Sequence, residues 1–200
     1  MDEFQGAIRT LATLDNFLLV GSTDNTCKIY EYDEETNIYK QTAYLHNSKE
    51  YIYSTLIVKQ GDQYRFIFAG KDKSIYIVTK TGELIKEIEK AHNGPICSIT
   101  SNSKYFVTGS WDSTAKVWDL ETFENVKVIE CEEFAHAVTT CVLSNDVIVA
   151  ASQKMPMNFW SCKDFYKVKR IGLAHDDITR KIKELPGYSD GVNFASCSND

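Results

Sequence analysis

Hydrophobic residues along this chain gather in short runs, and clusters of polar, turn-forming residues separate one run from the next. The pattern is clearest over residues 91–120, where three runs cover Ile96–Thr100, Tyr105–Ser110 and Thr114–Trp118. Short runs of this kind, bounded by Asn, Ser, Asp and Gly, are typical of β-strands joined by tight turns. The segment therefore predicts three short strands in an antiparallel meander.

Four polar or amphipathic side chains of this segment would meet in such a meander. His92 precedes the first strand, Thr108 lies in the second, Asp112 in the following turn and Trp118 in the third. A buried imidazole and a buried indole each need a hydrogen-bond partner. Asp112 can accept from the imidazole, and the Thr108 hydroxyl can bond to the imidazole and accept from Trp118, so that every member is satisfied. The segment resembles one complete repeat of the WD-repeat family, with Trp118-Asp119 as its name-giving dipeptide.

Less regular copies of this segment recur along the chain at a period of about 40 to 45 residues. The predicted repeats cover residues 1–45, 46–90, 91–133, 134–173 and 174–200, the last of them incomplete. A fourth strand is expected near 38–44, 84–89 and 125–130. The predicted fold is all-β: a WD-repeat β-propeller with about four and a half blades. Because a propeller removes its sheet edges by closing a ring, we expect this chain to be the front portion of a longer propeller.

The four histidines, His46, His92, His136 and His175, are interpreted as one equivalent position of the repeat. In isolation, His136 could be a metal ligand or a general base, because a cysteine and two glutamates lie close to it in the sequence. Recurrence at one histidine per repeat places the four in separate blades. The pattern therefore favours a structural role for each of them.

Networks equivalent to that of His92 are predicted, in full or in part, in other repeats. In the fifth repeat, His175, Ser196 and Asp200 correspond to the histidine, hydroxyl residue and aspartate of the third. The second repeat keeps the aspartate as Asp72 but lacks both the hydroxyl residue and the indole. The fourth keeps the indole as Trp160 but lacks the aspartate, so its network is expected to be incomplete.

Composition and charge narrow the classes of protein to consider. A hydrophobic content of 43% in 200 residues is enough for a sizeable core. A net charge of −6, with Lys and Arg scattered, argues against a general nucleic-acid surface. No apolar run approaches the ~20 residues that cross a bilayer, and the first residues do not begin a signal peptide. Six cysteines without CxxC spacing are expected to be buried thiols in a reducing compartment.

Sequence signals for catalysis are missing. The chain has no GxSxG, no HExxH, no phosphate-binding Gly-rich loop and no Cys or His cluster at metal-ligand spacing. Its carboxylate runs, at 33–35 and 130–133, are typical of solvated loops. We therefore expect a protein that is not an enzyme, uses no cofactor or metal, and acts by binding other proteins.

Several motifs occur in an order that narrows the resemblance. They are GKD at 70–72, GSWD at 109–112, TAKVW at 114–118, HDD at 175–177 and SCSND at 196–200. This series resembles the amino-terminal propeller of the phospholipase A2-activating protein family, whose fungal members act in ubiquitin-dependent degradation. In that family the propeller has seven blades and binds ubiquitin.

The resemblance implies that this chain is a ubiquitin-binding adaptor of the cytoplasm and nucleus. Family members continue with a second ubiquitin-binding module and an α-helical domain, which docks on the AAA ATPase valosin-containing protein. The implied contact with that ATPase would thus need domains outside this sequence. The alternative is a general WD-repeat scaffold for another protein complex.

The partner surface is predicted where the loops before each first strand meet the turns between second and third strands. The candidate residues in these loops and turns are Thr23, Lys71, Asn93, Trp111, Gln153 and Asp176. Trp111 is the principal candidate, because nothing in the repeat needs an indole there and exposed aromatic residues are typical binding hot spots. The alternative is that its ring lies flat against its own blade. For ubiquitin, Trp111 would meet the small hydrophobic patch, and acidic residues such as Asp176 would meet the basic residues around that patch.

Overall fold

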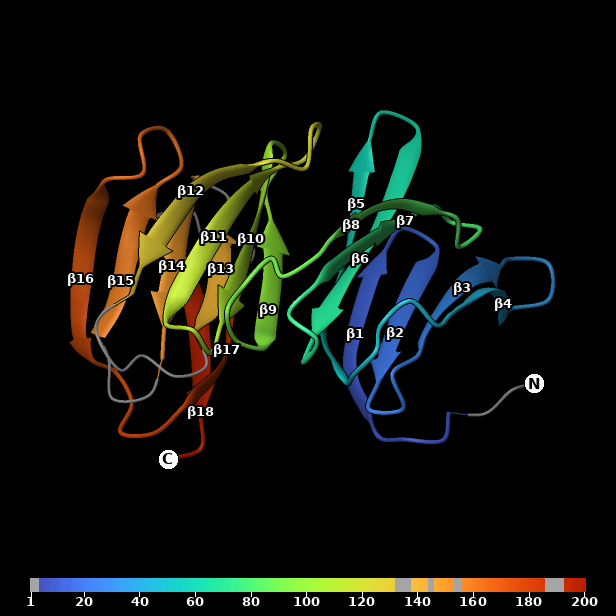
Figure 1. Ribbon diagram of the computed structural model, residues 1–200, viewed down its shortest axis with the longest axis horizontal. Helices are drawn as coiled ribbons and strands as arrows, with labels where there is room; N and C mark the ends of the chain where they lie inside the picture. The colour runs from blue at the N-terminus through green and yellow to red at the C-terminus, as the bar shows by residue number, and fades with distance from the viewer. Residues whose placement is uncertain (1–3, 132–137, 144–145, 153–155, 186–192) are drawn as a thin grey trace. The chain divides into compact units, whose positions relative to one another are not determined.

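The computed structural model describes residues 4–131, 138–143, 146–152, 156–185 and 193–200 (Figure 1). Within these ranges the chain forms β-strands joined by turns and loops, and no helix occurs. It divides into two compact units, Met1–Ile96 and Cys97–Asp200. The predicted all-β class is confirmed, and each sheet is called a blade below, numbered in chain order.

The first unit contains two four-stranded antiparallel blades, in each of which the strand order follows the chain. Blade one consists of β1 (Ile8–Leu14), β2 (Phe17–Ser22), β3 (Cys27–Asp33) and β4 (Ile38–Leu45). Blade two consists of β5 (Ile52–Gln60), β6 (Gln63–Gly70), β7 (Ile75–Val78) and β8 (Leu84–Ile88). Each strand therefore pairs with its neighbour in sequence, as a meander requires.

Blades one and two bury a common apolar core. The second and third strands supply most of it, because their nearly continuous hydrophobic sequences are covered on both faces. Leu19 and Ile29 of blade one join Phe66 and Phe68 of blade two in this core, and all four are fully buried. Burying side chains of this size stabilises the fold by roughly 1.5–3 kcal/mol each.

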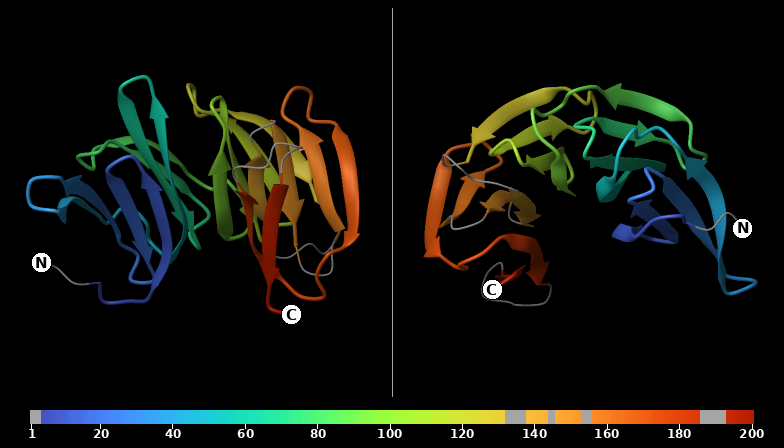
Figure 2. Two further views of the ribbon diagram at one scale, coloured as in Figure 1. Left: turned by 180° about the vertical axis from the view of Figure 1, so that it is seen from behind. Right: turned by 60° about the horizontal axis from the view of Figure 1, so that its bottom comes forward.

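The second unit contains blades three and four and a fifth, two-stranded sheet. Blade three consists of β9 (Ile96–Ser101), β10 (Tyr105–Ser110), β11 (Thr114–Asp119) and β12 (Asn125–Glu130). Blade four consists of β13 (Thr139–Leu143), β14 (Val147–Ala151), β15 (Pro156–Ser161) and β16 (Lys167–Leu173). The fifth sheet pairs β17 (Thr179–Leu185) with β18 (Asn193–Ser198), and β17 packs against β13 (Figure 2).

Two apolar clusters hold the second unit together. One joins blades three and four and includes Val117, Ile148 and Trp160. The other joins blade four to the fifth sheet and includes Phe159 and Ile182. Trp160 and Phe159 are consecutive residues of β15, so their side chains point to opposite faces and serve the two clusters. Blade four is thus covered on both sides.

Hydroxyl groups and a glycine fix the spacing between neighbouring blades. Ser98 and Thr140 share a 3.0 Å hydrogen bond between β9 and β13, and Thr10 and Thr55 share one of 2.8 Å between β1 and β5. A Cβ atom on Gly109 would lie 2.0 Å from the carbonyl oxygen of Val138. Only glycine permits that approach of β10 to the next blade.

Candidate partner-binding surface

The turns between second and third strands share one geometry in the first three blades. The turn aspartates are Asp24, Asp72 and Asp112, and each accepts the backbone N–H of the residue two positions later at 3.0 to 3.2 Å. The residue directly after each aspartate, namely Asn25, Lys73 or Ser113, has a positive φ of 69–70°. Since non-glycine residues rarely adopt this conformation, the hydrogen bonds of the aspartate help to hold the turn closed.

The second carboxylate oxygen of the turn aspartate holds the segment that leads into the first strand. The N–H of Gln5 donates to Asp24 at 2.7 Å, and that of Lys49 donates to Asp72 at 3.2 Å. In the fifth sheet the N–H of Asp176 donates to Asp200 at 2.6 Å. This bond holds the pKa of the Asp200 carboxyl below its usual range. One aspartate therefore ties together the two chain segments that carry the candidate binding residues.

Blade three contains the predicted contact between an indole and a hydroxyl. The Trp118 indole N–H donates to Thr108 Oγ1 at 2.9 Å, and both side chains are buried. His92 is only 1% exposed, and its backbone N–H donates to the carbonyl of Lys73 at 3.3 Å. Asp112 accepts from the hydroxyl and the N–H of Thr114 at 2.7 and 3.0 Å.

The fifth sheet places its three predicted network residues in contact. His175 Nε2 lies 2.9 Å from the hydroxyl of Ser196, and Nδ1 lies 3.1 Å from a carboxylate oxygen of Asp200. The imidazole is thus oriented by one acceptor and bonded to one hydroxyl, as in the network expected for the third repeat. Both of these contacts are with β18 or the residues directly after it, which indicates a structural role.

Blade two departs from the prediction, because His46 does not occupy the repeat position. Its side chain is exposed and packs edge-on against Tyr44, with ring centroids 4.1 Å apart. The position four residues before the first strand, held by His92 and His175 elsewhere, belongs to Ser48. Two extra residues before β5 shift the histidine out of register, and a pattern search for histidine alone could not detect the shift.

Ser48 and Tyr76 build a different network around Asp72. The Ser48 hydroxyl donates to Asp72 at 2.8 Å, and the Tyr76 hydroxyl donates to the same oxygen at 2.9 Å. The Tyr76 ring stacks on Phe68 with centroids 5.2 Å apart. Burial, and then the hydrogen bond to Asp72, raise the pKa of Tyr76. The blade therefore satisfies its turn aspartate without either histidine or tryptophan.

Trp111 is one of the exposed large hydrophobic residues of the second unit. Its exposed fraction is 49%, and it directly precedes the turn aspartate Asp112. An exposed fraction near one half leaves part of the indole open to solvent and fits a ring that lies against its own blade as well as one that projects from it, so the binding role of Trp111 stays a prediction. Asp176 is also exposed. Gln153 and His136 lie outside the described residues.

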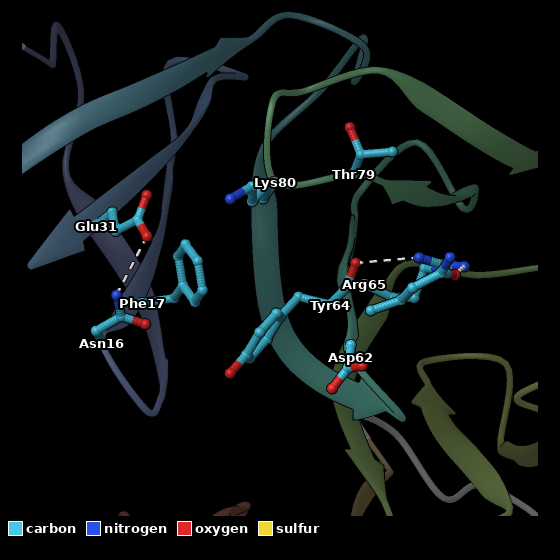
Figure 3. Close-up of a pocket in the computed structure, with 9 residues that line it drawn as sticks. Asn16, Phe17, Glu31, Asp62, Tyr64, Arg65, Thr79 and Lys80 are labelled. Atoms are coloured by element: carbon cyan, nitrogen blue, oxygen red, sulfur yellow. Dashed lines mark hydrogen bonds between the residues drawn. The ribbon is translucent and has the colours of Figure 1, made fainter.

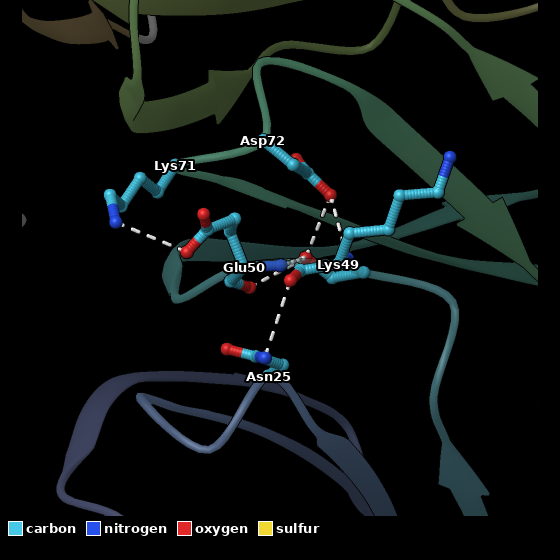
Figure 4. Close-up of polar contacts among 6 residues, drawn as sticks. Asn25, Lys49, Glu50, Lys71 and Asp72 are labelled. Atoms are coloured by element: carbon cyan, nitrogen blue, oxygen red, sulfur yellow. Dashed lines mark hydrogen bonds and ion pairs between the residues drawn. The ribbon is translucent and has the colours of Figure 1, made fainter.

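In the first unit two candidate residues, Lys71 and Asn93, lie on adjacent loops, and the hydroxyl of a third, Thr23, is hydrogen-bonded within the unit. Lys71 is exposed and forms a 3.1 Å ion pair with Glu50 (Figure 4). The bond from His92 to Lys73 brings the loop that carries the exposed Asn93 to the same turn. Thr23, in contrast, accepts the N–H of Ala7 at 2.9 Å, so its hydroxyl is used to hold the N-terminal segment.

Two tyrosines near Lys71 were missed by sequence reasoning. Tyr51 is 42% exposed, with the Lys71 ammonium 5.1 Å from its ring centroid. Tyr53 lies 6.5 Å from Tyr51, with the Arg9 guanidinium 5.9 Å from its ring. The spacing of two along a predicted strand was the available signal, because it places both rings on one face. Together these residues form a surface of aromatic and cationic groups, a composition enriched at protein interfaces.

Loop-to-loop contacts stiffen this surface. The side-chain amide of Asn25, in the turn of blade one, donates to the carbonyl of Lys49 at 3.3 Å (Figure 4). Lys49 in turn donates its N–H to Asp72 in blade two. The turns of the two blades are therefore linked through one short segment before β5.

The hairpins of blades one and two enclose an open cleft of about 410 Å³ (Figure 3). These hairpins lie at the opposite ends of the strands from the turns that carry the aspartates. Phe17 and Tyr64 form an aromatic wall with ring centroids 4.7 Å apart. The rim carries charges of both signs, from Glu31 and Asp62 and from Lys80. Because the cleft is open and its charges are of both signs, its lining does not indicate one class of ligand. The described residues that line it form no catalytic arrangement.

Among the described residues no group of three or more His, Cys, Asp or Glu side chains could hold a metal ion. In the same part of the chain no helix is long and apolar enough to cross a membrane. The six cysteines are free thiols, and four of them are buried. Burial raises the pKa of Cys97 to about 12 and that of Cys162 to about 11, so these thiols stay protonated at neutral pH and are poor nucleophiles.

Comparison with known proteins agrees with this geometry. Residues 82–119 match the family described as WD domain, G-beta repeat. The WD40 β-propeller domain of Doa1 superimposes with a TM-score of 0.77 at 20% identity, covering 100% of this chain and 66% of that one. The chain thus carries a WD repeat and has the WD40 β-propeller fold, which defines it as a protein-interaction module.

Three curated relatives are similar over much of the chain. Protein DOA1 of Saccharomyces cerevisiae is 23% identical over 201 residues, covering 96% of this chain and 26% of that protein. Ubiquitin homeostasis protein lub1 of Schizosaccharomyces pombe is 28% identical over 137 residues, covering 68% and 18%. WD repeat-containing protein pop1 of the same yeast is 27% identical over 157 residues, covering 61% and 20%. The chain therefore spans about a fifth to a quarter of the length of these relatives.

Proposed function

We propose that this chain is a non-catalytic adaptor module that binds ubiquitin or ubiquitinated proteins in the cytoplasm and nucleus. The single observation that carries the proposal is the half-exposed Trp111 at the turn of the most regular repeat. Similarity to the ubiquitin homeostasis protein lub1 supports ubiquitin as the partner. Exposed tryptophans are among the residues that contribute most to binding free energy at interfaces.

The turn that carries Trp111 is held rigidly before any partner arrives. The following residue, Asp112, accepts hydrogen bonds from the N–H and the hydroxyl of Thr114, and its own N–H donates to the hydroxyl of Ser110 at 3.1 Å. A side chain on such a turn loses little conformational freedom on binding. The indole would contact the hydrophobic patch of ubiquitin, and exposed carboxylates such as Asp176 would face the basic residues around that patch.

Ubiquitin-dependent degradation with an AAA ATPase is part of the same proposal. The 200 residues would supply ubiquitin recognition, and the ATPase would be contacted by other domains of the assembly. Neither role requires a catalytic group in these blades.

Titration of fluorescently labelled monoubiquitin with the chain tests the proposal. A contact centred on one aromatic residue buries a modest area, so we expect micromolar affinity, about −7 to −8 kcal/mol. A labelled globular protein of similar size and charge provides the control. Equal binding of both proteins, or saturation of neither, would contradict ubiquitin recognition.

The second candidate function is a general WD-repeat scaffold for another protein complex. The surface of Tyr51, Tyr53, Arg9 and Lys71 favours it, because these residues form an interface-like cluster in the other unit. If ubiquitin does not bind, a Tyr51→Ala variant that loses partners from a native complex would support the scaffold function.

A further inference from the structure

The first strands of blades one and two carry an irregularity at the same place. In β1 the pairing with β2 shifts register after Ile8, which leaves Arg9 as the extra residue. In β5 the pairing with β6 shifts after Ile52, which leaves Tyr53 as the extra residue. A bulge of this kind re-aims the side chain of the extra residue. The two blades therefore display one cation and one aromatic ring from equivalent positions.

The two bulges bring their side chains together within the first unit. The Arg9 guanidinium lies 5.9 Å from the centroid of the Tyr53 ring. The ring of Tyr53 meets that of Tyr51 edge-on, with centroids 6.5 Å apart and an interplanar angle of 68°. The Lys71 ammonium lies 5.1 Å from the Tyr51 ring. Successive contacts thus join Arg9, Tyr53, Tyr51 and Lys71 in one continuous row, called the bulge surface below.

A comparison inside the chain shows that the bulge alone does not explain this row. A bulge on an edge strand prevents unwanted pairing, and that purpose makes no demand on the extra side chain. Strand β17 has the same bulge, with Arg180 as its extra residue. The Arg180 guanidinium donates to the side chain of Asn199 at 2.7 Å, so it is used within its own sheet. Arg9 is exposed, and in the part of the chain that the structure describes no carboxylate forms an ion pair with it.

The two ends of the bulge surface differ in charge. Lys71 forms a 3.1 Å ion pair with Glu50 (Figure 4), and this contact raises the pKa of the lysine. Its charge is therefore already matched, whereas the charge of Arg9 at the other end is not. Between the two ends, Tyr51 is 42% exposed. The surface thus offers one open cation and one open aromatic ring.

We propose that the bulge surface binds an acidic peptide segment of a partner protein, with a carboxylate on Arg9 and an apolar side chain on Tyr51. A guanidinium matches a carboxylate with two parallel N–H donors, which fixes the direction of the segment as well as its charge. Binding to this partner is a specific case of the scaffold function proposed above for the same residues, and it rests on that function.

A peptide fits these observations better than a single-stranded nucleic acid does. Bases stack on open aromatic faces beside several backbone-tracking cations. Here the two rings meet edge-on, and Glu50 stands beside Lys71, where it would repel a phosphate. A net charge of −6 also opposes a long polyanion more than a short segment that contacts one cation.

Fluorescence anisotropy with a short labelled peptide of alternating glutamate and leucine tests the proposal. We expect saturable binding that weakens as salt is added, because Arg9 is exposed. Arg9→Gln should weaken binding by about fivefold, as the loss of an exposed charge pair does. Arg180→Gln, at the equivalent bulge of the fifth sheet, is the matched control and should bind within about twofold of the unmodified chain. Circular dichroism establishes that both variants are folded.

The aromatic part of the bulge surface needs its own variants. Tyr51→Ala should weaken binding of the leucine peptide and leave binding of a serine-substituted peptide unchanged, whereas Tyr51→Phe, which keeps the ring, should bind as the unmodified chain does. Trp111→Ala should also bind the peptide normally, which separates this site from ubiquitin recognition.

Equal losses in Arg9→Gln and Arg180→Gln would overturn the proposal, as would tighter binding of a single-stranded DNA oligonucleotide than of the peptide. Failure of the unmodified chain to bind the peptide would overturn it as well. If Tyr51→Ala nevertheless loses partners from a native complex, the scaffold function stands without this partner chemistry.

Discussion

The indole N–H of Trp118 donates a 2.9 Å hydrogen bond to the hydroxyl of Thr108, and both side chains are buried in blade three. The contact joins the second strand of the blade to the third, next to the turn that carries Trp111. It shows how a short polar pair inside an apolar sheet fixes strand register where a partner-binding residue is displayed. The first prediction follows from it.

Thr108→Val should destabilise the chain by about 1–3 kcal/mol, because it leaves a buried indole donor without its acceptor. Thermal or denaturant unfolding measures the loss. Thr36→Val, in the exposed loop between β3 and β4, is the matched control and should change stability by less than about 0.5 kcal/mol. Similar losses for the two variants would show that the indole bond contributes nothing specific.

Removal of two histidines should have unequal effects. His175→Ala breaks contacts with Ser196 and Asp200 and should cost about 1–2 kcal/mol. His46→Ala removes an exposed ring and should cost less than about 0.5 kcal/mol. The comparison uses unfolding midpoints under identical conditions. Equal midpoint shifts would contradict the structure, in which Ser48 and not His46 occupies the repeat position.

Gly109→Ala should destabilise the second unit by about 1–3 kcal/mol, because the added methyl group would overlap the carbonyl of Val138. Gly172→Ala is the matched control, since nothing lies within 4 Å of its added Cβ and its φ is not positive. The control should be neutral or slightly stabilising, by about 0.4–1 kcal/mol. A neutral Gly109→Ala variant would contradict the close approach of β10 to the next blade.

Stability should fall in acid partly through the turn aspartates. Burial alone would raise the pKa of Asp24, but hydrogen bonds from Thr26 and from the N–H of Gln5 outweigh it and lower the pKa below its ordinary value of 3.8. A lowered pKa in the folded state means that the stabilisation is present above pH 3.8 and is lost as the pH falls towards the folded-state value. Asp24→Asn should therefore be less stable than the unmodified chain at pH 7, and the difference should shrink below pH 3.8. A difference that stays constant over this range would rule out the carboxylate as its cause.

Much of the fold was predictable because the blade is a local structure. The runs at Tyr105–Ser110 and Thr114–Trp118 correspond to β10 and β11 within one residue, since short-range turns set both ends of each strand. The expected fourth strands at 38–44, 84–89 and 125–130 correspond to β4, β8 and β12. Strand β16 was not anticipated, because its cations mask the alternation that marks a strand.

The site was less predictable, because its chemistry depends on contacts between segments distant in sequence. Tyr76 donates to Asp72 in a blade that lacks the indole, and the pattern of the third repeat does not predict this contact. Thr23 has the same place in the turn as Trp111, yet it holds the backbone of Ala7. A repeat identifies which residues are equivalent in position, but it does not identify which of them remain available to a partner.

The most direct test of the central claim is an NMR titration of isotope-labelled ubiquitin with the chain and with two aromatic variants. Resonances of the hydrophobic patch of ubiquitin should shift with the unmodified chain, and Trp111→Ala should remove most of that shift while the chain stays folded. Tyr166→Ala, which removes another exposed aromatic residue of the same unit, should leave the shifts unchanged. Patch resonances that do not move, or that move equally with Trp111→Ala, would contradict ubiquitin recognition through Trp111.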